Sequence, residues 1–316
     1  MDWVDYVRDQ AKEETARLLR EGNVEVIIST SVQRLLQAME GFVDAISNNV
    51  TIERASDFNV ALLLRCVAKK SQESLKAIVE LTEHSQAYYA MPLLRPMCEE
   101  LIFIRFMKSL PRSDADAYLY DKVMLDIYEG LEAQRDFFNT VQREYPDHIR
   151  KMYEPHHGEA LDMPTLIREK RERLKDIGRK LGWAKGRAPK VKDMAESTGL
   201  QGEYAFFYHA TSSAVHANVH YIWRMVAGNP HTGMTISNKN FDKYYRHFVL
   251  TYGAWLTTAI VDEVAGEFTE QWYEAAEDAS ADYDTWRDLV KFIVGATRFP
   301  PIVTEVELRW PGGIDG

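Results

Sequence analysis

Two stretches of this chain decide its fold: Ala90-Met-Pro-Leu-Leu-Arg-Pro-Met-Cys-Glu-Glu-Leu-Ile-Phe-Ile104 and Tyr204-Ala-Phe-Phe-Tyr-His-Ala-Thr-Ser-Ser-Ala-Val-His-Ala-Asn-Val-His220. Apolar residues recur in both at spacings of three and four, which is the period of an α-helix. Both also carry ionisable groups among apolar residues, where an unpaired charge costs free energy. The sequence therefore predicts that these two helices face one another and either pair their polar groups or form a site.

The helical period continues through most of the remaining chain, so we expect an all-α fold. Helix start and stop signals place the helices at residues 3–19, 24–46, 58–82, 88–110, 114–145, 165–181, 189–197, 203–226, 240–268, about 270–279 and 284–294. We expect a single domain over residues 1–298, a bundle of long antiparallel helices with a small basic helical insertion at 146–200. Residues 299–316 are predicted to form an extended tail.

Composition narrows the class of protein. The net charge of −10 over 316 residues argues against a general binder of polyanions. The two cysteines, Cys66 and Cys98, lie in apolar helical context and suit a reducing cytoplasm. No basic and apolar leader opens the chain, and the nearly uncharged stretch 247–261 is too short to span a membrane. We expect a cytoplasmic protein without a membrane segment, and we predict no cofactor because no phosphate-binding glycine loop occurs.

Arg95 and Glu99 stand four residues apart, so a helix places them on one face. Pro96 lies between them and removes one backbone hydrogen bond from that helix. A buried Arg–Glu pair that fixes helix register has the same spacing as a functional pair. Both interpretations stay open from the sequence.

Three histidines of the second stretch, His209, His216 and His220, fall within about 40° of one another on a helix. His216 and His220 also have the i, i+4 spacing with which two imidazoles share a metal, and Glu99 is a candidate third ligand. Histidines that bond to hydroxyl groups in a core have the same pattern. We assign no metal ligand from the sequence.

A basic stretch runs from Arg168 to Lys192, with 11 Lys and Arg against 3 Asp and Glu. One interpretation is a solvated helix and loop. The other is a phosphate-contacting surface beside a site. In the second interpretation the candidate nucleic-acid-binding residues are Arg179, Lys180, Lys185 and Arg187.

The chain resembles a bacterial family of uncharacterised all-helical proteins over roughly residues 55–265. The family pairs an Ala-x-x-Leu-Leu-Arg-x-x-x-Glu helix with a Tyr-x-x-x-Tyr-x-x-x-Ser-x-x-x-His helix. The matching residues here are Ala90, Leu93, Leu94, Arg95, Glu99, Tyr204, Tyr208, Ser212 and His216. That family is distantly similar to the HEPN group of helical nucleases and toxins, which use an Arg-x4–6-His motif.

The HEPN motif itself is absent before His216, because none of the three residues 5–7 positions upstream is arginine. The bare spacing does occur elsewhere, for example at Arg224 and His231. The resemblance implies an endoribonuclease only if Arg95 takes the place of the missing arginine in space. His216 then acts as general base or acid, Arg95 as the phosphate clamp, and Glu99 orients Arg95.

Three functions follow from these patterns. The first is a HEPN-like effector of bacterial defence or toxin–antitoxin systems that cleaves RNA without a metal. The second is a non-catalytic interaction or sensor module with a buried Arg–Glu–His network, and the third is a metal-dependent hydrolase. Residues supporting the site from a second layer are Ser212, Tyr204, Tyr208, His209 and His220. RNA or a protein is the expected partner, and the long apolar stripes predict a homo-oligomer.

Overall fold

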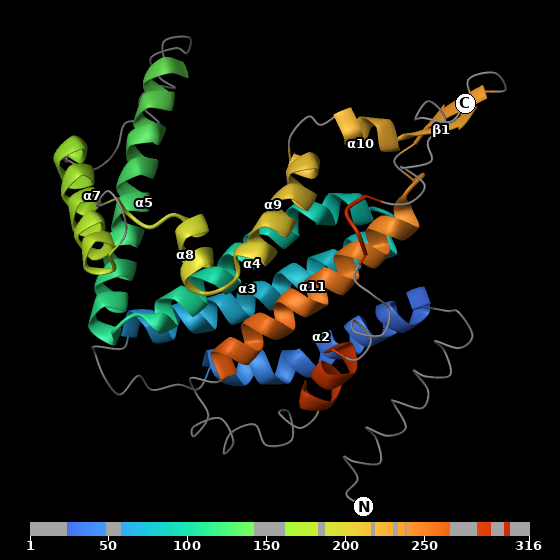
Figure 1. Cartoon of the computed structure of the whole chain (residues 1–316), viewed down its shortest axis with the longest axis horizontal. Helices are drawn as coiled ribbons and strands as arrows, with labels where there is room; N and C mark the ends of the chain where they lie inside the picture. Colours follow the sequence, from blue (N-terminus) through green and yellow to red (C-terminus); the bar gives the residue numbers. More distant parts are fainter. Residues whose placement is uncertain are drawn as a thin grey trace, which may run out of the picture. The chain divides into compact units, whose positions relative to one another are not determined.

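The protein is an all-α helical structure, as the sequence predicts. The structure, a computed structural model, describes residues 24–48, 58–141, 162–182, 187–215, 219–229, 233–237, 239–265, 283–291 and 300–303. Figure 1 shows the helices that these residues form, coloured along the sequence. None of the helices in these ranges is both long enough and apolar enough to cross a membrane.

The elements follow one another along the chain as long helices interrupted by one small hairpin. They are α2 (Val24–Asn48), α3 (Phe58–Glu83), α4 (Ala87–Ser109), α5 (Arg112–Val141), α7 (Met163–Lys180), α8 (Val191–Ser197), α9 (Gln201–Val215), α10 (Val219–Arg224), β1 (Val226–Asn229), β2 (Gly233–Ile236) and α11 (Asp242–Ala265). Residues 283–291 are also helical. The helices expected at 3–19 and 270–279 lie outside the described residues.

The chain divides into two compact units. The first holds residues 1–51, 63–105 and 195–316, and the second holds residues 52–62 and 106–194. The expectation of one helical domain over 1–298 stays a prediction.

The first unit is built around α11, whose uncharged middle lets the helix be buried on almost every side. Buried residues run from Tyr245 to Val264 along it. Gly253 approaches α3 closely, because a Cβ added there would lie 2.9 Å from Cδ1 of Ile78. Phe207 of α9 stacks on α11 at Trp255, with ring centroids 6.1 Å apart. Helix α2 also packs on α11. Apolar burial around one helix thus fixes the position of α9 relative to α3.

The second unit contains α5 and α7, which pack side by side (Figure 1). Asp162 caps the start of α7 by accepting a hydrogen bond from the Thr165 backbone N–H at 3.3 Å. Lys170 of α7 donates to Asp121 of α5 at 2.6 Å, and both side chains are at most 10% exposed. A buried charge is tolerated here because its partner is buried with it.

The helix expected at 203–226 is helical in α9 and α10, but the expected end at residue 226 is wrong. The structure ends α9 at Val215, begins α10 at Val219 and places Val226 in strand β1. Strands β1 and β2 pair antiparallel, with Val226 opposite Ile236. Gly233 has a φ of +129°, which side-chain-bearing residues rarely adopt. The helical period is therefore overridden only from Val226 onward, where β1 pairs with β2.

The start of the predicted tail is fixed on α11. Tyr252 donates a hydrogen bond to the Pro300 carbonyl at 2.9 Å, and Tyr244 donates to the Pro301 carbonyl at 2.7 Å. Arg224 donates to the Ile302 carbonyl at 2.6 Å. Residues 304–316 lie outside the described residues.

Candidate functional site

Helix α4 carries the first half of the candidate site. Its apolar residues Ala90, Leu94, Cys98 and Leu101 are buried, and they face the interior at helical spacing. Pro92 and Pro96 both lie inside the helix, which runs on through them to Ser109. The face that carries Arg95 and Glu99 stays partly open, and each of these two side chains is 30% exposed.

Arg95 and Glu99 form a direct ion pair on that face. Nε of Arg95 donates to Oε1 of Glu99 at 2.8 Å. This hydrogen bond is the main reason that the pKa of Arg95 is raised above its ordinary value, and the guanidinium is therefore held charged. Glu99 takes only the Nε–H, so the terminal amino groups of Arg95 make no hydrogen bond to a described residue.

Helix α9 supplies the aromatic side of the site. The guanidinium carbon of Arg95 lies 4.5 Å from the ring centroid of Tyr208. Tyr204 and Tyr208, one turn apart, have ring centroids 5.8 Å apart. Burial raises the pKa of Tyr204, and the charge of Glu99 adds to this effect. The predicted convergence of the two helices is therefore present for Arg95, Glu99, Tyr204 and Tyr208.

The predicted histidines are not brought together in the part of the chain that the structure describes. His209 is exposed. It lies about 100° around the helix from Tyr208. Ser212 is half-buried, one turn beyond Tyr208. His216 and the side chain of His220 lie outside the described residues, so their roles stay predictions.

The residues on either side of Glu99 along α4, Cys98 and Glu100, both have raised pKa values. Cys98 is buried, and burial together with the charges of Glu203 and Glu99 raises its pKa to about 12. Burial also raises the pKa of Glu100, which pairs with Lys70 of α3. Arg95 thus pairs with Glu99, while the next carboxylate along α4, Glu100, pairs with Lys70.

The predicted nucleic-acid-binding residues are paired within the second unit wherever they are described. Lys180 binds Asp114 at 3.3 Å, and Arg179 pairs with Asp176. Arg187 donates two hydrogen bonds to Asp193, at 2.5 and 2.6 Å. These hydrogen bonds are the main cause of the lowered pKa of Asp193. Lys185 lies outside the described residues. The local excess of positive charge is therefore partly neutralised by carboxylates of the same unit.

Arg224 has the HEPN-like spacing to His231, but its guanidinium binds other groups. It is 8% exposed, and its guanidinium carbon lies 4.9 Å from the ring centroid of Tyr244. Its terminal nitrogens donate to Tyr245 Oη and to the Ile302 carbonyl. Arg224 thus holds the tail, while His231 lies outside the described residues.

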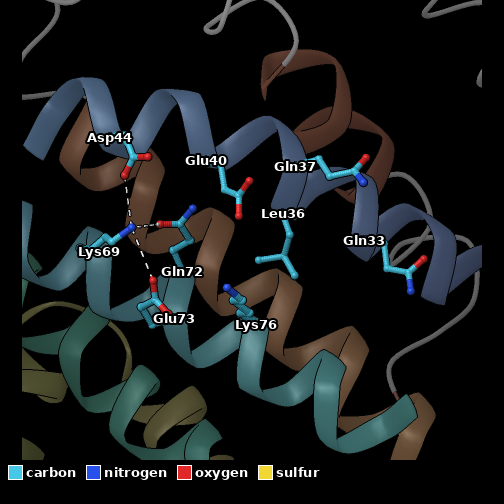
Figure 2. Close-up of a pocket in the computed structure, with 9 residues that line it drawn as sticks. All are labelled: Gln33, Leu36, Gln37, Glu40, Asp44, Lys69, Gln72, Glu73 and Lys76. Atoms are coloured by element: carbon cyan, nitrogen blue, oxygen red, sulfur yellow. Dashed lines mark hydrogen bonds and ion pairs between the residues drawn. The ribbon is translucent and has the colours of Figure 1, made fainter.

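A polar groove between α2 and α3, of about 540 Å³, has no counterpart in the sequence analysis. Figure 2 shows Lys69 at one end, bound to Asp44, Gln72 and Glu73. Leu36 is its one apolar lining residue. The sequence does contain polar residues at helical spacing on both helices, which could have indicated this groove. The same pattern is typical of any solvated helix face, so it does not distinguish a groove.

No group of three or more His, Cys, Asp or Glu side chains is placed to hold a metal ion within the described ranges. The hydrolase interpretation depends on His216 and on the side chain of His220, which lie outside what the structure describes.

The comparison with family models gives one match. Residues 61–232 match a family described as "Family of unknown function (DUF5677)". The chain belongs to this family. The match spans α4 and α9, so the pair of helices that carries Arg95 and Tyr208 lies inside the matched residues. No curated protein and no solved structure matches this DUF5677 member.

Proposed function

We propose that this DUF5677 protein is a cytoplasmic HEPN-like effector that cleaves RNA in bacterial defence or toxin–antitoxin biology. The observation that supports the proposal is the state of Arg95. Its guanidinium is fixed by Glu99 and stacked on Tyr208, yet its terminal amino groups bind no described residue. A planar guanidinium held in this way is suited to bind a phosphodiester with two hydrogen bonds.

His216 is the proposed base. The four-residue spacing of Tyr204, Tyr208, Ser212 and His216 predicts that the imidazole follows the tyrosines along one helix face. A neutral imidazole removes the proton from a ribose 2′-hydroxyl at physiological pH. The 2′ oxygen then bonds to phosphorus while the bond from phosphorus to the 5′ oxygen breaks. The products are a 2′,3′-cyclic phosphate and a 5′-hydroxyl, whose proton comes from the imidazolium.

Arg95 and Glu99 have separate roles in this reaction. Arg95 neutralises the charge that develops on the phosphoryl oxygens, where positioned cations have their largest effect. Glu99 is a positioning residue, because its carboxylate accepts from Nε of Arg95 and fixes that side chain. The proposed chemistry requires a base and a cation and is written without a metal.

The test is cleavage of a defined single-stranded RNA by the full chain in EDTA, with product ends identified by mass spectrometry. His216→Ala is expected to lose about 10²–10⁴-fold in turnover as a missing general base, and Arg95→Ala about 10²–10³-fold. His84→Ala is the matched control, because His84 is an exposed histidine just after α3 and belongs to no part of the proposed site. Equal turnover in wild type and His216→Ala, or no turnover in wild type, would contradict the proposal.

A second function, a non-catalytic interaction or sensor module, is favoured by one specific observation. Arg179, Lys180 and Arg187 are each paired with carboxylates, which leaves less positive surface for RNA than the sequence suggests. If this function is correct, Arg95→Ala and His216→Ala lower the free energy of unfolding and no variant or wild type cleaves RNA. Urea unfolding of the same variants measures that effect.

A further inference from the structure

Helix α5 exposes a continuous apolar stripe. We define the α5 stripe as four residues with their exposed fractions: Tyr120 (54%), Val123 (52%), Ile127 (47%) and Leu131 (40%). At 100° per residue, these four positions fall within about 80° of one another. Large apolar side chains that lie together on a surface mark interaction sites more often than chance exposure does.

Between Tyr120 and Leu131 no charged residue of α5 itself lies within the arc of the α5 stripe, although Nζ of Lys170 on α7 lies 4.5 Å from the ring centroid of Tyr120. Lys122, Asp126 and Glu129 all lie outside this arc. Helix α7 packs on another face, where Asp121 and Leu125 are buried. The helix is therefore apolar on two sides, and only one of these is covered by α7.

The spacing of the exposed residues fits a second helix. Ala117, Tyr120, Met124, Ile127, Leu131 and Gln134 follow one another at alternating intervals of three and four residues. This alternation is the seam along which two helices interlock their side chains. All six side chains are exposed or half-buried. Five of the six are apolar, so the seam is able to exclude water.

We propose that the α5 stripe is the surface through which two copies of this chain associate, with their α5 helices antiparallel. The seam is self-complementary in that direction. A twofold axis at its midpoint sets Ala117 of one copy against Gln134 of the other and Tyr120 against Leu131. Met124 then meets Ile127. An isologous contact of this kind closes on itself as a dimer.

The charges at the two ends of the seam favour the antiparallel direction. Asp114 and Asp116 lie near its first turn, while Arg135 stands at its far end and makes no ion pair with a described residue. Antiparallel pairing brings Arg135 of each copy near the acidic end of the other. Parallel pairing sets Arg135 beside Arg135, where like charges repel.

The test measures the mass of the full-length protein in solution by sedimentation velocity over a range of concentrations. Wild type is expected to be a dimer. Leu131→Glu puts two carboxylates into the seam, and we expect the self-association constant to fall roughly a hundredfold. The matched control is Leu62→Glu, because Leu62 is a leucine of similar exposure, 44%, on α3. That control is expected to remain a dimer.

Direction is tested by disulfide formation in a Cys66→Ser background. Ala117→Cys and Gln134→Cys are about 25 Å apart along one helix. A mixture of the two proteins is expected to cross-link, whereas Ala117→Cys alone is not. A monomeric wild type overturns the proposal, as does a Leu131→Glu variant that dimerises like wild type. Cross-linking of Ala117→Cys to itself overturns the antiparallel arrangement. Each readout is independent of RNA cleavage.

Discussion

The guanidinium carbon of Arg95 on α4 lies over the ring of Tyr208 on α9, 4.5 Å from the ring centroid, while Nε of Arg95 donates to Glu99. The contact links two helices that are more than 100 residues apart along the chain. The cation lies over the π face of the tyrosine ring, which attracts it electrostatically.

The first prediction concerns this stacking contact. Tyr208→Leu and Arg95→Met each lower the free energy of unfolding, and a double-mutant cycle gives a coupling of about 0.5–1 kcal/mol, the size of an exposed cation–π contact. Tyr208→Phe keeps the ring and is expected to keep the coupling. Urea unfolding measures all variants. If the losses in unfolding free energy of the two single substitutions are strictly additive in the double variant, the contact does not contribute to stability.

The second prediction concerns the two thiols. Burial raises the pKa of Cys98 from its ordinary value of 9.0 to about 12, whereas Cys66 is exposed. At pH 8 buried Cys98 therefore holds about a thousandfold less thiolate than an ordinary cysteine. Iodoacetamide is expected to label native protein once, at Cys66. Cys66→Ser should remove that label, and rapid labelling of Cys98 in the native state would contradict the burial.

The raised pKa of Cys98 also makes the free energy of unfolding depend on pH in the alkaline range. Between pH 9 and 12, Cys98 keeps its proton in the folded state but loses it in the unfolded state. Since the unfolded state then binds fewer protons, the free energy of unfolding falls as pH rises through this range. Comparing wild type with Cys98→Ala isolates the effect, because the variant should lose less stability over the same interval.

The third prediction concerns the buried pair between Lys170 and Asp121. Removing one partner leaves a buried charge, so Asp121→Ala is expected to cost about 3 kcal/mol of unfolding free energy. The double variant Asp121→Leu/Lys170→Met should recover much of that loss. Glu129→Ala is the control, because Glu129 pairs with Arg171 at the surface and an exposed pair contributes less than about 1 kcal/mol. Equal losses at Asp121 and Glu129 would refute the distinction.

The fourth prediction uses the same substitution at two helical glycines. A Cβ at Gly253 meets Ile78 Cδ1 at 2.9 Å and Leu75 Cδ1 at 3.3 Å, whereas a Cβ at Gly130 meets nothing within 4 Å. Gly253→Ala is therefore expected to destabilise by about 1 kcal/mol through overpacking. Gly130→Ala should stabilise by about 0.5–1 kcal/mol, since alanine favours the helix. Thermal unfolding measures both, and the same sign at both sites would contradict the packing of α11 on α3.

The helices, and the residues that share a helix face, could be predicted from the sequence because side-chain direction follows from local spacing. The i, i+4 relation of Arg95 and Glu99 predicted a shared face, and the structure gives an ion pair there. The expected helix at 58–82 is α3, which runs from Phe58 to Glu83. Local sequence spacing was sufficient in both cases, since each feature depends only on residues within a few helical turns.

Contacts between distant segments could not be predicted from the sequence. The sequence offered the basic residues after Arg168 as a phosphate surface, but Lys180 of that stretch pairs with Asp114 on α5. The strand at Val226 depends on a partner strand that begins at Gly233. Nothing in the local pattern distinguishes these residues from a solvated helix or a helical end.

By itself the sequence determined that this chain is helical, which residues share a face, and that polar groups of α4 and α9 need partners, because all three depend on local spacing and on the cost of an isolated charge. Only the tertiary structure decided that Tyr208 covers the guanidinium of Arg95, that carboxylates neutralise the basic stretch, and that α5 leaves an apolar face exposed. These outcomes depend on which faces meet, and that choice is made by burial of apolar surface over the whole chain.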